Sequence, residues 1–154
     1  MTSKIPDFSG LKVAVAGDAM LDEHWFGDAE RISPEAPVPV VRAEHTEQRA
    51  GGAANVAVNL AALGASVEFF GIVGDDANGA ALERSLTDAG VTTHLLKSAD
   101  LPTIHKLRVL ARNQQLIRLD AEKQLAALAA ELNRCFVDKV GSPDVVVLSD
   151  YGKG

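Results

Sequence analysis

The sequence predicts an α/β fold in which parallel strands alternate with crossover helices. Its hydrophobic residues switch repeatedly between short continuous runs and helical spacing, which is typical of layered α/β proteins. The runs are only five to seven residues long and rich in valine and phenylalanine, as in strands buried on both faces. The predicted strands are residues 12–17, 67–73 and 144–149, and the predicted helices are about 52–63, 78–89 and 122–140.

The three helices are predicted from apolar residues that recur every three or four positions. Gly64 and Gly90 follow the first two patterns and mark where those helices end. The inward-facing positions are Val56, Leu60 and Leu63 in the first helix, Leu82 and Leu86 in the second, and Leu125, Leu128, Leu132 and Phe136 in the third.

Two stretches do not fit this alternation. Residues 24–48 contain Pro34, Pro37 and Pro39, whose spacing disfavours helix and favours extended backbone. Residues 102–120 predict two strands, 103–111 and 115–119, joined by a turn near Asn113 and Gln114. We expect both stretches to form a small separate sheet, a lid over the open edge of the main one, within a single unit spanning residues 1–154.

Composition and charge disfavour several classes of function, among them nucleic-acid binding and membrane insertion. With 47% apolar and 23% charged residues, the 154-residue chain has an ordinary globular composition. A net charge of −6 disfavours nucleic acid as a partner. Cys135 is the only cysteine, which suits a reducing compartment, and no apolar run has the length of a signal or a membrane span. We therefore expect a cytoplasmic protein with no membrane partner.

Asp18 is the first candidate site residue, because it follows the first predicted strand directly. Ligands of α/β proteins bind beyond the carboxyl ends of the strands, and a carboxylate there can accept hydrogen bonds from two hydroxyls of a polyol. The alternative is that Asp18 only caps a turn. The turn lacks the glycines of a dinucleotide fingerprint, so a nicotinamide-binding domain is not predicted.

Gly51, Gly52 and Asn55 form the second candidate group, at the start of the first predicted helix. Paired glycines let a ligand approach the backbone closely, and the first turn of a helix offers unpaired N–H groups. The alternative is that the small residues of this helix merely allow tight packing on the sheet.

Lys106, Arg108 and Arg112 form the third group, since strand alternation places them on one face of residues 103–112. Three cations on a lid strand would suit a phosphate clamp, although such a stripe is also common on a solvated face. The four histidines show no short metal-ligand spacing, so we predict no protein metal site.

Segments 51–64 and 71–79 together resemble the amino-terminal signature of the ribokinase-like (PfkB-type) carbohydrate kinases. Within that family, segments 17–22, 31–39, 106–120 and 148–154 are similar to the heptose 7-phosphate kinases. The resemblance covers most of the chain. It implies a ribokinase-like fold, a parallel central sheet flanked by helices with a small β lid.

The resemblance also implies an activity and a substrate. ATP, with Mg²⁺, would phosphorylate O1 of D-glycero-D-manno-heptose 7-phosphate to the 1,7-bisphosphate, on the route to ADP-heptose and the lipopolysaccharide core. Sugar hydroxyls would be bound by Asp18, Gly51, Gly52 and Asn55, and the phosphorylated substrate also by Arg31, Lys106, Arg108, Arg112, Asp150 and Lys153. His105 stands where the family leads us to expect threonine.

The family's Gly-Ala-Gly-Asp motif, which carries the catalytic base, has no counterpart in residues 1–154. We therefore expect the chain to be the amino-terminal half of the kinase, with the base and the ATP site beyond Gly154. Alone it should be inactive and fold poorly. Family resemblance further implies a homodimer formed through the lid strands. The alternatives are another PfkB-type sugar kinase, or a non-catalytic sugar-binding or assembly module.

Overall fold

A computed structural model describes residues 7–112, 114–124 and 128–153. Strands and helices alternate along much of the chain. The strands are β1 (Lys12–Gly17), β2 (Ala19–Ile32), β3 (Pro39–Gly52), β4 (Ser66–Gly74), β5 (Thr92–Ser98), β6 (Ile104–Ala111), β7 (Gln114–Ala121) and β8 (Val145–Ser149), and the helices are α1 (Ala53–Ala62), α2 (Ala77–Asp88) and α3 (Ala129–Lys139).

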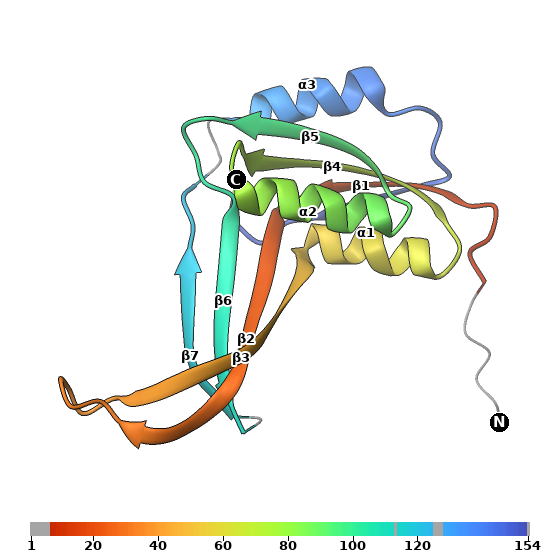
Figure 1. Ribbon diagram of the computed structural model, residues 1–154. Helices are drawn as coiled ribbons and strands as arrows, with labels where there is room; N and C mark the ends of the chain where they lie inside the picture. Colours follow the sequence, from red (N-terminus) through yellow and green to blue (C-terminus); the bar gives the residue numbers. More distant parts are fainter. Residues whose placement is uncertain (1–6, 113, 125–127, 154) are drawn as a thin grey trace.

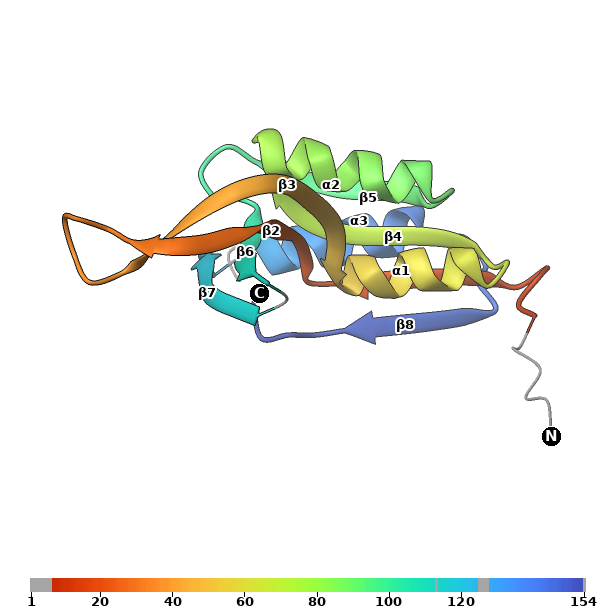
Figure 2. The same cartoon turned by 60° about the horizontal axis from the view of Figure 1, so that its bottom comes forward.

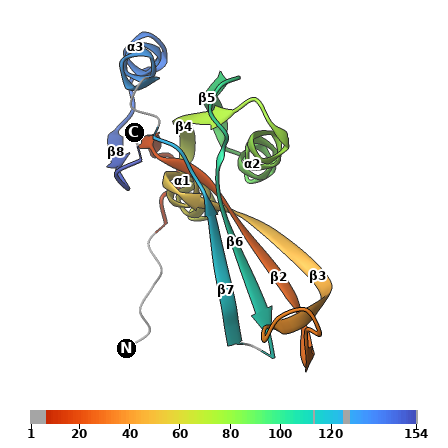
Figure 3. The same ribbon diagram turned by 90° about the vertical axis from the view of Figure 1, so that its left-hand side faces the viewer.

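Sheet A is the parallel central sheet that the sequence predicts. Its strand order is β5-β4-β1-β8, and each neighbouring pair is parallel. Helices α1 and α2 lie against one face of this sheet and α3 against the other (Figures 1 and 3). The expected α/β architecture is confirmed.

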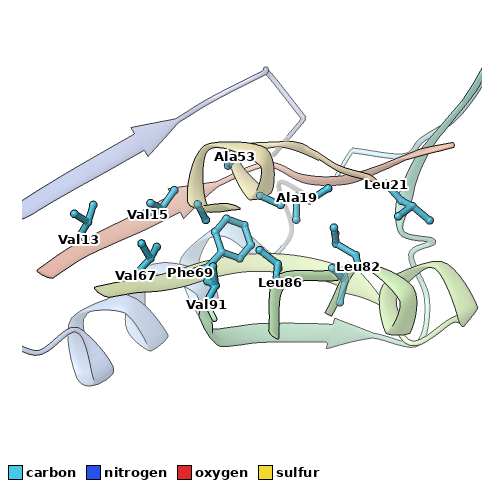
Figure 4. Packing of buried hydrophobic residues seen from close by; sticks show 14 of the residues in the cluster. Val13, Val15, Ala19, Leu21, Ala53, Val67, Phe69, Leu82, Leu86 and Val91 are labelled. Carbon is cyan, nitrogen blue, oxygen red and sulfur yellow. The ribbon is translucent and has the colours of Figure 1, made fainter. Parts of the chain in front are cut away.

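The main hydrophobic core lies between sheet A and the two helices α1 and α2 (Figure 4). Val15, Phe69, Leu82 and Leu86 are fully buried in it, as the helical and strand patterns predict. Each buried side chain of this size contributes roughly 1.5 to 3 kcal/mol. The prediction for α1 is confirmed only in part. Val56 and Leu60 are half-buried against the same cluster, but Leu63 is the C-cap, and the fully buried residues of the helix are Ala53, Ala54 and Ala57.

Helix α3 is shorter than predicted, because residues 122–124 are not helical. Leu125, one of its expected inward positions, lies outside the described residues. The other three do face the sheet: Leu128 and Leu132 pack near Ile72, and the Phe136 ring meets Phe70 edge-on at 4.9 Å. No described residue of α3 is fully buried, because the helix lies over a sheet face that it covers alone.

Strand β5 was not predicted. It pairs with β4 at the edge of sheet A, where its residues are mostly half-buried, so it lacks a continuous apolar run. At the opposite edge, the apolar run of β8 predicts a strand that is buried on both faces only where further elements cover it, and within this chain it is largely exposed. Only its Val147 packs against the core, while Val146 and Leu148 are 47% and 76% exposed, because no described strand lies beyond β8.

Sheet B is the separate sheet expected from two stretches of the sequence, one rich in proline and the other with alternating side chains. Its order is β3-β2-β6-β7, with β2 parallel to β6 and the other pairs antiparallel. It projects from the carboxyl end of sheet A, and the β2–β3 hairpin extends past β6 and β7 (Figure 2). Of the predicted turn near Asn113 and Gln114, Asn113 lies outside the described residues and Gln114 begins β7.

A buried polar joint connects sheet B to the core. Thr103, just before β6, donates its hydroxyl to Asp76 Oδ1 at 2.7 Å and its N–H to Asp76 Oδ2 at 2.8 Å. Asp76 Oδ1 also accepts from the Gly79 N–H, which caps α2. Burial opposes ionisation of Asp76, but these hydrogen bonds favour the carboxylate and together hold its pKa below the usual value. The joint therefore fixes the start of β6 against the start of α2.

We predict that Asp76→Asn destabilises the protein by about 1 to 2 kcal/mol at neutral pH, because hydrogen bonds to a charged acceptor are lost. Because the pKa of Asp76 is lower in the folded state, its ionisation stabilises the fold at pH values above the usual value of 3.8. This contribution to the free energy of unfolding is lost as the pH falls through the lowered pKa. In urea unfolding at several pH values, the difference from wild type should shrink below about pH 4. The exposed Asp100→Asn is the control; an Asp76→Asn deficit that persists undiminished in acid would contradict this account.

Candidate functional site

Asp18 lies at the corner between β1 and β2 and is almost completely buried. Its Oδ2 accepts the N–H of Tyr151 at 2.7 Å and the N–H of Lys153 at 3.1 Å. Its backbone N–H donates to Ser149 O, and its backbone oxygen accepts the Ala53 N–H. Within the described residues, the hydrogen bonds to this carboxylate all involve Oδ2, which leaves Oδ1 available to a ligand.

Gly51 and Gly52 lie against this corner and have no room for a side chain. A Cβ on Gly51 would lie 2.3 Å from Asp22 Oδ2, and one on Gly52 would lie 2.5 Å from the backbone oxygen of Asp18. Gly52 also has φ +57, a left-handed value that favours glycine. The two glycines therefore let Asp18, Asp22 and the start of α1 approach one another.

The start of α1 is open in the described residues. Gly52 is its N-cap and supplies no side-chain hydrogen bond, and Asn55 is exposed in the first turn. The side-chain oxygen of Asn55 accepts a hydrogen bond from the side-chain amide of Asn59 at 3.3 Å. The NH₂ group of the Asn55 side chain takes no part in this contact. Unpaired N–H groups and a side-chain amide can bind hydroxyls or an anion.

A cavity of about 290 Å³ opens at Asp18 on the α3 side of sheet A. Its polar lining comes from Asp18, Ser149, Asp150 and Asn133, and its apolar lining includes Ile72 and Leu132. Asp150 is exposed, and its Oδ1 accepts the Gly152 N–H at 2.6 Å, which shapes the loop after β8. The cavity thus lies at the carboxyl ends of β1 and β8, where α/β proteins bind ligands.

The predicted cationic stripe runs along the polar face of sheet B, and each member has an acidic partner. Lys106 Nζ lies 3.4 Å from Asp120 Oδ2, Arg108 donates to Asp22 Oδ1, and Arg112 Nε lies 2.7 Å from Asp28 Oδ1. The Arg112 guanidinium lowers the pKa of Asp28, and Asp28 in turn raises the pKa of Arg112. The stripe is therefore neutralised along its length rather than freely positive.

The stripe is too long for all three cations to contact one small ligand. Lys106 is in register with Asp22, four residues along β2 from Asp18, whereas Arg112 follows Ala111, which is in register with Gly27. At about 3.3 Å per residue, Arg112 lies roughly 30 Å along the strand from Asp18. Arg112 also has φ +50 and stands beyond the end of β6.

Arg31 lies still farther out, near the end of the β2–β3 hairpin, where it is exposed and in register with Val40. Thirteen residues of extended strand separate it from Asp18 by up to about 40 Å. It lines a larger cavity of about 470 Å³ with Asp28, Val41 and Arg42, but that cavity lies on the hairpin alone. This chain does not bring Arg31 to the Asp18 corner.

Lys153 does reach the corner. Its N–H donates to Asp18, and its Nζ lies 2.8 Å from Glu122 Oε1. Of the residues predicted from the sequence, the structure therefore brings together Asp18, Gly51, Gly52, Lys106, Arg108, Asp150 and Lys153, with Asn55 in the first turn of α1.

The pfkB family carbohydrate kinases match residues 11–152 of the chain. The chain belongs to this family. It is 56% identical over 151 residues to the bifunctional protein HldE of Methylococcus capsulatus, which covers 97% of the chain and 32% of that protein. It is 52% identical over 158 residues to HldE of Shewanella sp. strain MR-4, covering 100% of the chain and 33% of that protein. The chain thus spans about a third of the length of these curated relatives.

Solved structures agree on the fold of this pfkB-family chain. A carbohydrate kinase from Agrobacterium tumefaciens superposes with a TM-score of 0.68 at 22% identity, covering 90% of this chain and 45% of that one. A ribokinase from Cryptococcus neoformans in complex with ADP gives 0.52 at 25% identity, covering 78% of this chain and 38% of that one. The expected ribokinase-like fold is confirmed.

Two acidic residues at the site were not predicted as site residues. Asp22 lies against Gly51 and holds Arg108, and Glu122 holds Lys153. Strand alternation places Asp22 on the same face as Lys106 once β2 and β6 are paired, but nothing in the sequence shows that pairing. His105 points to the opposite face of sheet B, where its Nε2 lies 2.8 Å from Glu23 Oε2, so its departure from threonine does not alter the polar face.

The part of the chain that the structure describes contains neither a candidate membrane-spanning helix nor a candidate metal cluster. None of the helices there has the length and apolar character that crossing a bilayer requires. Over the same residues, no group of three or more histidine, cysteine, aspartate or glutamate side chains is arranged to hold a metal ion.

We predict that Gly51→Ala lowers the free energy of unfolding by about 1 to 3 kcal/mol, because the new methyl group would overlap the Asp22 carboxylate and push it from Arg108. Gly141→Ala is the matched control, since nothing lies within 4 Å of a Cβ at that position. Urea unfolding of both variants tests this, and equal stabilities would mean that the close approach at Gly51 is not required.

Proposed function

We propose that the protein containing this chain uses ATP to phosphorylate D-glycero-D-manno-heptose 7-phosphate at O1. Membership of the pfkB family supports a carbohydrate kinase, and identity above 50% to HldE proteins over the whole chain supports a shared activity. The observation that carries the substrate class is the juxtaposition of the Asp18 corner with Lys106, Arg108 and Lys153. A carboxylate that can bind hydroxyls beside cations that can bind phosphate suits a sugar phosphate.

In this proposal the chain binds and orients the sugar. Asp18 Oδ1 and the start of α1 at Gly52 and Asn55 accept and donate hydrogen bonds to ring hydroxyls, while Asp150 shapes the loop beside them. Positioning of this kind supplies much of the catalysis in phosphoryl transfer. ATP would supply the phosphoryl group, and ATP, Mg²⁺ and the catalytic base would be held by other parts of the intact protein.

The reaction would act in the cytoplasm, in the synthesis of ADP-heptose for the lipopolysaccharide core. The substrate is a small molecule, and neither nucleic acid nor membrane is a proposed partner. The comparisons favour neither of the alternatives, another pfkB-type sugar kinase or a non-catalytic module.

We further propose that the protein is a homodimer joined through sheet B. The face opposite the cationic stripe carries an apolar row in which Trp25 is in register with Val109, and Val109 with Ile117. Leu119 extends this row, and Trp25, Ile117 and Leu119 are 39%, 49% and 51% exposed. An exposed apolar sheet face of this kind is typical of an interface, and a second copy offers a matching one.

The proposed activity is tested by steady-state kinetics of the intact protein with ATP and three sugars. We expect kcat/KM for heptose 7-phosphate to exceed that for unphosphorylated heptose and for fructose 6-phosphate by at least about 100-fold, because the phosphate and the extra hydroxyls are bound together. The product should carry phosphate on O1. Equal use of unphosphorylated heptose would contradict the proposed substrate class.

We predict that Asp18→Asn weakens heptose 7-phosphate binding by about 1.5 to 3 kcal/mol, because an amide replaces a charged acceptor of sugar hydroxyls. Isothermal titration calorimetry measures the dissociation constant directly. Asp138→Asn, an exposed position on α3, is the control. A dissociation constant unchanged by Asp18→Asn would remove Asp18 from the sugar site.

For the dimer, we predict that Leu119→Lys shifts the protein from dimer to monomer in sedimentation velocity, because it places an unpaired charge on the apolar face. Val137→Lys is the matched control, because Val137 is 73% exposed on α3, away from sheet B. A Leu119→Lys protein that remains dimeric would show that the copies associate through another surface.

A further inference from the structure

The apolar face of sheet B carries a polar pair beside Trp25. His105 Nε2 on β6 lies 2.8 Å from Glu23 Oε2 on β2, and the indole N–H of Trp25 donates to Glu23 Oε1 at 3.1 Å. Trp25 belongs to the apolar row of the proposed interface, where it is in register with Val109. One carboxylate therefore connects a histidine to an aromatic side chain of that interface.

His105 differs from the other three histidines in its position. His24 and His45 lie on the polar face of sheet B, where both rings stack with Phe26. His94 lies on β5 of sheet A. Of the four histidines, a second copy bound to the apolar face would therefore cover His105.

Association of two copies would bury this pair further. The side chains of His105 and Glu23 are 17% and 15% exposed, and Trp25 beside them is 39% exposed. A copy packed on Trp25 removes water that remains around the carboxylate. Burying a carboxylate beside neutral hydrogen-bond donors is costly, whereas a cation in contact with it offsets part of that cost. The charge of His105 therefore affects the free energy of association.

We propose that protonation of His105 strengthens the association of two copies through sheet B, which makes the dimer tighter at about pH 6 than at about pH 8. This inference rests on the proposed homodimer. Histidine is the side chain that ordinarily changes charge in this pH range. Because the buried Glu23 carboxylate favours the protonated imidazole, the dimer binds that proton more tightly than a free copy does. Association therefore takes up protons, and the affinity rises as the pH falls.

The elements around His105 supply its other neighbours. Strand β7 places the uncharged Ala121 in register with it. At the start of α2, the Asp76 carboxylate is bound by Thr103, two residues before His105. Burial opposes ionisation of Asp76, but its hydrogen bonds hold its pKa below the usual value, so it stays an anion between about pH 6 and pH 8. Glu23 is thus the carboxylate in contact with His105, and the imidazole is the group whose charge changes in this range.

The proposal is tested by sedimentation velocity of the intact protein over a dilution series at about pH 6, 7 and 8. For the wild type we expect the dimer dissociation constant to fall about tenfold or more across this range, because each copy takes up a proton. His105→Gln keeps a hydrogen-bond donor for Glu23 but does not titrate, so its dissociation constant should change less than about twofold. His94→Gln is the matched control and should behave as wild type, because His94 contacts Glu68 on sheet A, at 3.2 Å.

Glu23→Gln supplies the decisive result. Without the carboxylate, a protonated His105 would be buried alone, so this dimer should weaken as the pH falls. A misfolded variant would instead be weaker at every pH. A wild-type dissociation constant that does not change with pH, or an equal pH dependence in wild type and His105→Gln, would overturn this proposal and leave the homodimer standing. A protein that is monomeric at every pH would overturn both, and the proposed kinase activity is measured separately by turnover.

Discussion

The fold depends on one buried carboxylate, Asp18, whose Oδ2 accepts two backbone N–H groups from the loop after β8. A buried charge without such partners would be costly, so these hydrogen bonds fix the loop as much as they fix Asp18. Through its backbone, the same residue also contacts the ends of β8 and the start of α1. The ends of β1 and β8, the start of β2 and the start of α1 therefore meet at one residue.

Charge pairing neutralises the polar face of sheet B. Each cation there already has a carboxylate partner, so a neutral sugar gains nothing by displacing one. In the proposed function a phosphate group would gain, because its charge is higher than that of a carboxylate and it has one more acceptor oxygen. Such a site would distinguish a sugar phosphate from an unphosphorylated sugar.

The sequence predicted those features that depend on local pattern. The strand around Phe69 and the helix containing Leu82 and Leu86 follow from periodicity. The prolines were expected to favour extended backbone, but Pro34 and Pro37 lie in the bend between β2 and β3, and only Pro39 is in a strand. Strand β5 could not be predicted, because an edge strand with mixed exposure lacks a clear period. Nor could the acidic partner Glu122, because its contacts with Lys106 and Lys153 join residues far apart in sequence. Pairing across strands also revealed that Arg31 and Arg112 lie far from Asp18.

The most direct test of the account is a crystal structure of the intact protein with heptose 7-phosphate bound. We predict ring hydroxyls within hydrogen-bond distance of Asp18 Oδ1, with the sugar between the loop after β8 and the polar face of sheet B. Because Asp18 is fixed by its own hydrogen bonds, it should move little on binding. A sugar bound elsewhere, for example in the hairpin cavity beside Arg31, with the Asp18 corner empty, would contradict the account.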